Sequence, residues 1–362
     1  MDRILATYRI AASESESRAR AEALAVEQSV EMPLSAIGDE RVLREVVATV
    51  ESIRPHAGHF DVVLGIACST TGREASQLMN MLFGNCSMQP EIELTDVQFP
   101  AGYEKSFPGP RFGVEGIRTV TGVEKRPLTC TALKPQGSPV EHLARLARTF
   151  ALAGIDVIKD DHGIANQAAH PFEPRVIAVQ NAINQANRET GGNTVYAPTF
   201  SGGGLSLREQ ARVANDHGVK MALVAPMLVG IPAFVEMQVD LPLPLMAHPA
   251  FAGGARIAPP TLMGRLFRLF GADATIFPNY SGRFGYSRQM CLDIARAARE
   301  PWEQVRPAMP VPAGGMLLER VDEMVADFGN DTMLLIGGGL LSARDQLLER
   351  SREFVRKVRA GR

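Results

Sequence analysis

The apolar and polar positions along this chain of 362 residues follow two rhythms, one up to residue 120 and another beyond it. In the first part, strand-like apolar runs are separated by helical patterns. Ser13 stands at an N-cap position and Glu16 completes a capping box, which marks the start of the first helix. We predict strands over 3–10, 61–66 and 91–97, and helices over 13–27 and 74–82. This order indicates a small α+β domain over residues 1–120.

Residues 121–362 repeat a different unit, in which short apolar runs mostly alternate with amphipathic helical segments. We predict strands over 129–133, 157–159, 194–198, 221–225, 243–247, 274–277, 311–313 and 333–336. We predict helices over 140–152, 175–188, 207–217, 260–270, 287–297 and 317–328. Eight strands with helices between them are typical of a (β/α)8 barrel. The alternative is an open doubly wound sheet, which the absence of a GxGxxG turn after a strand disfavours.

Composition excludes several classes of protein but does not indicate a function. A net charge of −2 gives no sign of nucleic-acid binding, and no apolar run approaches the length of a membrane span. The first residues lack the apolar core of a signal peptide. The four cysteines form no CxxC pair, so we expect neither a zinc site nor a disulfide framework, and a cytoplasmic location.

The stretch Asp156–His162 carries the strongest chemical signal. It begins as an apolar strand and ends in Lys159-Asp160-Asp161-His162. Residues two apart on a strand point to the same face, so Lys159 and Asp161 should project together, with His162 where the loop begins. A charged surface turn is the ordinary explanation. The functional alternative is an ion site at the carboxyl end of a barrel strand, where barrel chemistry is located.

Glycines follow the last two predicted strands, in Ala313-Gly314-Gly315 and in Gly337-Gly338-Gly339. Backbone N–H groups at these two ends of a barrel often converge on a phosphate. Glycines that merely permit tight turns are the alternative. Two such groups at these two strand ends favour a phosphate site.

Together these strand ends resemble the RuBisCO superfamily, and in particular its RuBisCO-like (type IV) members. Thr131-Ala132-Leu133-Lys134-Pro135-Gln136-Gly137 is similar to the T-x-K-P-K-x-G motif of the first barrel strand. Lys159-Asp160-Asp161-His162 is similar to K-D-D-E of the second, with His162 in place of the glutamate. Further similarities are His248 after strand five, the glycine motifs, Gly84-Asn85 and Glu27.

The resemblance implies roles for these residues. One Mg²⁺ per site would be held by a carbamate that CO2 forms on Lys159, together with Asp161 and His162. Phosphate would bind at Ala313, Gly314, Gly315, Gly337 and Gly338, and the catalytic residues would be Lys134, His248, Asn85 and Glu27. In the family the last two reach the site of a neighbouring subunit, so a homodimer with shared sites is expected.

Departures from the carboxylases indicate a different reaction. The loop 278–285 offers Arg283 but no lysine, and the expected histidine–arginine pair is His248-Pro249. CO2 fixation is therefore not expected. The resemblance implies metal-dependent enolisation of a ketose phosphate, with isomerisation of 5-methylthioribulose 1-phosphate as the leading reaction.

Three alternatives stay open at this stage. One is decarboxylation or carboxyl transfer on 3-oxo-isoapionate 4-phosphate. Another is enolisation of 2,3-diketo-5-methylthiopentyl 1-phosphate, and the third is a non-catalytic phosphate-binding relative. Apolar residues at strand ends can either accommodate a methylthio group or pack in the core: Phe200, Met227, Phe251 and Phe277.

Overall fold

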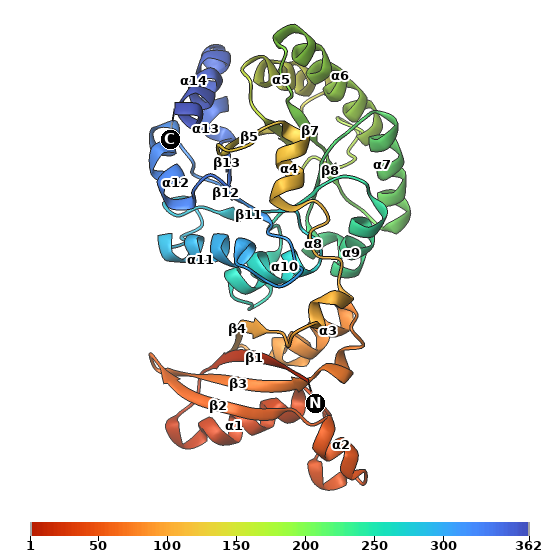
Figure 1. Cartoon of the computed structure of the whole chain (residues 1–362), viewed down its shortest axis with the longest axis vertical. Coiled ribbons are helices and arrows are strands. Elements are labelled where there is room, and N and C mark those ends of the chain that lie inside the picture. The colour runs from red at the N-terminus through yellow and green to blue at the C-terminus, as the bar shows by residue number, and fades with distance from the viewer. Residues whose placement is uncertain (1, 361–362) are drawn as a thin grey trace. The chain divides into compact units, whose positions relative to one another are not determined.

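The computed structural model describes residues 2–360, which divide into two compact units (Figure 1). The first contains the residues up to Phe107 together with Ala252–Leu262. The second contains Pro108–Phe251 and the residues from Met263 onward.

The N-terminal unit is built on a four-stranded antiparallel sheet with the order β2-β3-β1-β4. Its strands are β1 (Arg3–Ile10), β2 (Thr49–His56), β3 (His59–Ala67) and β4 (Ile92–Gln98), and its helices are α1 (Glu14–Glu27), α2 (Glu40–Glu45) and α3 (Ala75–Phe83). The predicted capping box is confirmed, because the Ser13 N–H donates to Glu16 Oε2 at 3.3 Å. Strand β2 escaped prediction because it is an exposed edge strand with Pro55 in it, and such strands lack an apolar face.

The second unit is a barrel of parallel strands with helices outside them (Figure 1). All eight predicted runs form strands, and the strand in the run 194–198 is followed after Pro198 by a short second segment that was not predicted. The strands are β5 (Leu128–Leu133), β6 (Val157–Asp160), β7 (Val195–Ala197), β8 (Thr199–Phe200), β9 (Ala222–Val224), β10 (Leu245–Ala247), β11 (Ala274–Pro278), β12 (Met309–Ala313) and β13 (Met333–Leu335). The predicted (β/α)8 barrel with an N-terminal α+β domain is confirmed.

Parallel pairing runs in two series, β13-β5-β6-β7 and β8-β9-β10-β11-β12. Strand β12 contains Pro310 and Pro312, which have no N–H to donate. A side chain links β12 to the beginning of β13 instead, since the Thr332 hydroxyl donates to Pro310 O at 3.0 Å.

The barrel helices follow the strands in sequence and form the outer ring. They are α5 (Val140–Leu152), α6 (Phe172–Thr190), α7 (Gly204–Asp216), α8 (Pro226–Val229), α9 (Ile231–Asp240), α10 (Phe267–Leu269), α11 (Arg288–Arg299), α12 (Val321–Phe328), α13 (Gly338–Leu341) and α14 (Leu347–Ala360). The predicted helix 260–270 is a π-helix over Pro260–Leu266 followed by the short α10. No helix within residues 2–360 is both long and apolar enough to cross a membrane.

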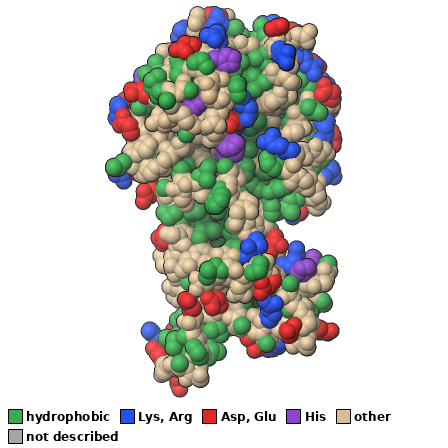
Figure 2. All heavy atoms as spheres, turned by 180° about the vertical axis from the view of Figure 1, so that it is seen from behind, with side chains coloured by type: hydrophobic (Ala, Val, Ile, Leu, Met, Phe, Trp, Pro, Cys, Tyr) green, Lys and Arg blue, Asp and Glu red, His purple; other side chains and the backbone are tan. Residues whose placement is uncertain are grey.

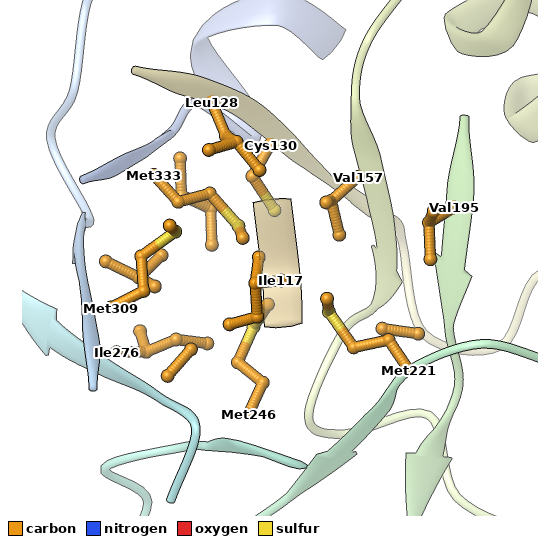
Figure 3. Packing of buried hydrophobic residues seen from close by; sticks show 14 of the residues in the cluster. Ile117, Leu128, Cys130, Val157, Val195, Met221, Met246, Ile276, Met309 and Met333 are labelled. Carbon is orange, nitrogen blue, oxygen red and sulfur yellow. The ribbon is translucent and has the colours of Figure 1, made fainter. Parts of the chain in front are cut away.

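Helix α4 (Gly113–Thr121) packs against the barrel interior near the amino ends of the strands, since Val157, Ala274 and Met309 in its cluster begin their strands (Figure 3). Its Ile117 is fully buried among Met221, Met246, Met309 and Met333. Thioether side chains adapt to irregular space, which suits a junction between a helix and several strands. The sequence did not predict α4, because GVEGIRTVT combines two glycines with five β-branched residues and forms a helix only through this packing.

A buried ion pair holds the end of β6 against α6. Arg175 Nε lies 3.1 Å from Asp160 Oδ2, and both side chains are fully buried. The Tyr196 hydroxyl donates to Asp160 Oδ1 at 2.8 Å and the Thr199 N–H to Oδ2 at 3.1 Å. Burial raises the pKa of this carboxyl, and the guanidinium of Arg175 acts against that shift. The pair therefore fixes which way the residues of this strand end point.

Replacing Arg175 with methionine should destabilise the barrel strongly, because Asp160 would remain buried without its counter-charge. We expect the free energy of unfolding to fall by about 3–5 kcal/mol in urea titrations. Arg148→Met is the matched control, since Arg148 pairs with Glu189 on the surface of the neighbouring helix. That change should cost about 1 kcal/mol or less. Equal losses in the two variants would show that burial of the pair is unimportant.

Candidate functional site at the strand ends

Residues from several strand ends meet at the mouth of the barrel. Lys134, after β5, forms an ion pair with Asp161, after β6. A Cβ built on Gly337, after β13, would lie 3.8 Å from Lys134 Cε. The ring of His162, after β6, stacks on that of His248, after β10. The structure thus brings together the predicted barrel residues of four strands. Figure 2 shows histidine side chains beside acidic and basic ones on one face of this unit.

Alternation along β6 separates the three charged residues as predicted. Asp160 points outward to Arg175, whereas Lys159 and Asp161 lie close enough for each charge to shift the pKa of the other. Lys159 is 3% exposed, and its Nζ donates to Asp160 O at 3.0 Å. Burial lowers the pKa of Lys159, because a buried ammonium loses its hydration. This amine is therefore unusually easy to hold in its neutral form.

Asp161 is the carboxylate that faces the mouth. Its Oδ2 accepts from Lys134, and its Oδ1 accepts from the Gly163 N–H at 3.1 Å. Partial burial acts to raise its pKa, but the hydrogen bond from Lys134 and the charges of Lys159 and Lys134 outweigh burial and lower it. Asp161 is thus held as an anion, able to bind a cation.

His162 and His248 form a stacked pair with ring centroids 4.2 Å apart and planes 16° from parallel. Burial lowers the pKa of His162, and burial with the nearby Lys159 charge lowers that of His248 to about 2. The Ala250 N–H donates to His248 Nδ1 at 3.1 Å. A neutral His248 therefore carries its proton on Nε2, where it can donate a hydrogen bond.

The glycine loops differ in how closely they are packed. Gly314 and Gly315 have φ of 74° and 77°, and a Cβ on Gly315 would lie 2.5 Å from Gly282 Cα in the loop after β11. Gly315 is therefore required for packing between two loops. A Cβ on Gly338 would meet nothing within 4 Å, so a side chain at this position would enter open space. Ala313 precedes these glycines at the end of β12, as predicted.

Glu27 and Asn85 lie together in the N-terminal unit. Glu27 ends α1, and Asn85 follows α3. Asn85 Nδ2 donates to Glu27 Oε1 at 3.1 Å and to Glu31 Oε1 at 3.0 Å. These two predicted site residues form one polar cluster although 58 positions separate them in sequence.

Comparison with known proteins identifies the family. The sequence matches the family Ribulose bisphosphate carboxylase large chain, catalytic domain, over residues 113–270. It is 51% identical over 360 residues to a Rhodospirillum rubrum protein named 5-methylthioribulose-1-phosphate isomerase, covering 99% of this chain and 96% of that one. A crystal structure of a Rubisco-like protein from Rhodopseudomonas palustris superposes with a TM-score of 0.94 and 48% identity, covering 100% of this chain and 99% of that one. The chain belongs to the family of RuBisCO-like proteins.

A more distant relative carries another name. This RuBisCO-like protein is 32% identical over 389 residues to a protein from Geobacillus kaustophilus named 2,3-diketo-5-methylthiopentyl-1-phosphate enolase. That alignment covers 100% of this chain and 94% of the relative. The similarity therefore spans both units of the fold.

The family implies a divalent metal ion, and the side chains at the site show which ligand atoms this RuBisCO-like protein offers it. Among residues 2–360, no three His, Cys, Asp or Glu side chains group as ligands for a metal ion. Asp161 offers a carboxylate and His162 an imidazole, with the amine of Lys159 near Asp161. A carbamate on Lys159 would add an oxygen donor, and its formation requires the neutral amine that burial favours. The residues fit a divalent cation once this lysine is modified.

Two residues that support the site of this RuBisCO-like protein were missed in the sequence. Arg175 and Tyr196 hold Asp160, and both are buried. One signal for Arg175 was available, since it shares a helix face with Phe172 and Val179 at helical spacing. A lone arginine on an apolar helix face indicates a buried acidic partner.

Proposed function

We propose that this protein isomerises 5-methylthioribulose 1-phosphate by transferring a proton through an enediol. The observation that carries the proposal is the convergence of Lys134, Lys159, Asp161, His162 and His248 beside glycine loops at one barrel mouth. The relative that is 51% identical is named for this reaction, which supports the choice of substrate. The protein is an enzyme in this account and not a CO2-fixing carboxylase.

The glycine loops would bind the phosphate of the substrate. The amides of Gly314, Gly315, Gly337 and Gly338 lie at the ends of β12 and β13, where barrels commonly hold phosphate. The open space beside Gly338 leaves room for the anion. Lys134 passes next to Gly337 and would add a positive charge to this region.

Proton transfer would fall to Lys134 and His248. Lys134, which pairs with Asp161, would first release the proton of its ammonium to solvent, and its amine would then accept a proton from the substrate. His248 would donate from Nε2 to the oxygen on which negative charge develops, because its Nδ1 already accepts from Ala250. Mg²⁺ held by carbamylated Lys159, Asp161 and His162 would act as a Lewis acid that lowers the pKa of the substrate C–H bond.

Carboxylation is disfavoured by the loop after β11. It presents Arg283, whose guanidinium lies 4.7 Å from the Phe284 ring centroid, and it has no lysine. Lysine is a compact, mobile point charge, whereas guanidinium is planar and stacks on aromatic rings. The loop is therefore unsuited to the part that a mobile lysine plays in holding CO2.

We further propose that the working form is a cytoplasmic C2 homodimer with shared active sites. Glu27 and Asn85 in the predicted domain 1–120 would complete the site that residues 121–362 of a second subunit carry. The four cysteines are buried free thiols, which supports a reducing compartment.

The proposed function predicts conversion of 5-methylthioribulose 1-phosphate into an isomer of equal mass, followed by ³¹P NMR and mass spectrometry. The reaction should need both Mg²⁺ and CO2, and Lys159→Ala should abolish it. Ribulose bisphosphate with CO2 should give no product. Full turnover after stripping with a chelator in CO2-free buffer would eliminate the metal–carbamate mechanism. A folded, activated enzyme inert towards this substrate would contradict the proposed function.

Gly338→Asp should weaken substrate binding without harming the fold. Its side chain would enter open space, so folding is tolerated, but its negative charge would stand where the phosphate belongs. We expect KM to rise about 100-fold, as for loss of a charge-assisted contact. Gly338→Ala is the control, because it adds a Cβ without charge and should change KM little. An unchanged KM in folded Gly338→Asp would mean that this glycine serves the turn alone.

Mixing two inactive variants tests the shared site. Glu27→Gln should inactivate the N-terminal contribution and Lys159→Ala the barrel contribution. After subunit exchange, a mixed dimer contains one site in which both residues are intact, so part of the wild-type activity should return. Exchange is followed by native mass spectrometry. No recovery among demonstrably mixed dimers would place each complete site within one chain.

A further inference from the structure

The loops at the barrel mouth differ in charge from one side to the other. Those after β8, β9 and β10 contain no lysine or arginine over residues 201–207, 226–230 and 248–251. Lys134 follows β5, Lys159 lies near the end of β6, and Arg283 lies in the loop after β11. The loops after β8, β9 and β10 therefore add no cationic side chain over these residues, whereas Lys134 borders the glycine loop after β13.

Phe251 is the exposed aromatic residue of the loop after β10, and Leu205 and Leu228 are exposed after β8 and β9. Of the four candidates for contact with a methylthio group, Phe200 and Phe277 are buried and pack edge-on against Phe172 and Phe328. Phe251 is 67% exposed, and Leu228 in the loop after β9 is 60% exposed. Core packing accounts for two of the candidates, but it does not account for Phe251.

The backbone at Phe251 is strained. Its φ is 67°, in the left-handed region that a bulky residue rarely adopts and that glycine adopts freely. Such conformations persist where the surroundings impose them, and they concentrate at functional sites. A glycine would relieve the strain and lose little buried surface, since Phe251 is 67% exposed.

The turn that carries Phe251 is tied to the site. The Ala250 N–H donates to His248 Nδ1 at 3.1 Å, and the His248 N–H donates to Val224 O at 2.7 Å. Pro249 between them has a fixed φ. The imidazole and the exposed ring are therefore held on one rigid turn, three residues apart.

We propose that Phe251, together with Leu228 in α8 after the neighbouring strand β9, binds the methylthio end of the substrate and determines specificity for it. This inference rests on the proposed function and deepens it. A methylthio group is uncharged, so it gains from apolar surface, and its sulfur interacts favourably with an aromatic ring. The phosphate would lie across the mouth, at the glycine loops after β12 and β13.

The test compares two substrates that differ only at the proposed contact. Ribulose 1-phosphate has a hydroxyl where 5-methylthioribulose 1-phosphate has the methylthio group. We expect Phe251→Ala to lower the ratio of their kcat/KM values about 10- to 100-fold, mainly through the methylthio substrate. Phe251→Leu should retain part of the preference, because it restores apolar surface. Val239→Ala, at a 62% exposed position on α9, should leave the ratio unchanged.

Each outcome has one meaning. If the wild-type enzyme turns over the methylthio substrate and Phe251→Ala leaves the ratio of the two kcat/KM values unchanged, the inference is overturned and the proposed function stands. An equal loss on both substrates, accompanied by dissociation in analytical ultracentrifugation, would assign Phe251 to a subunit contact and also overturn the inference. Wild-type enzyme inert towards the methylthio substrate would remove the proposed function itself, and the inference with it.

Discussion

The buried contact between Asp160 and Arg175 is the constraint on which the site depends. Asp160 is surrounded by Arg175, Tyr196 and Thr199, and burying it elsewhere without these partners would be costly. Because side chains alternate along a strand, fixing Asp160 outward fixes Lys159 and Asp161 towards the mouth. A shift of one residue along β6 would exchange its two faces and turn Lys159 and Asp161 into the wall of the barrel.

The mouth carries more positive than negative charge, which favours the binding of anions. Lys134 and Arg283 supply two cationic side chains and Lys159 supplies an amine whose pKa burial lowers, whereas Asp161 supplies one carboxylate and the two histidines are held towards their neutral forms. A phosphate and a carbamate would each reduce this excess. A carbamate on Lys159 would carry a negative charge, so a residue that repels metal ions when it is protonated would attract them once modified. Lysine side chains and a bound metal ion can therefore lie together at the end of β6.

Much of the fold and part of the site could be predicted from the sequence. All eight barrel strands were found because buried parallel strands are short apolar runs, and Lys159 and Asp161 were paired by simple alternation. Helix α4 could not be predicted, since its stability comes from Ile117 within the barrel core. Nor could the sequence tell that Gly315 packs against Gly282 while Gly338 borders open space, or that Phe251 is exposed while Phe277 is buried. Those differences depend on neighbours that are distant along the chain.

The central claim is that the end of β6 holds a lysine poised to react with CO2, and ¹³C NMR tests it most directly. Enzyme incubated with ¹³C-bicarbonate and Mg²⁺ is compared with a Lys159→Arg variant under the same conditions. The account predicts a protein-bound carbamate resonance that appears in the wild type, strengthens with Mg²⁺ and is missing from the variant. Absence of that resonance from active wild-type enzyme, or its persistence in the variant, would contradict the account.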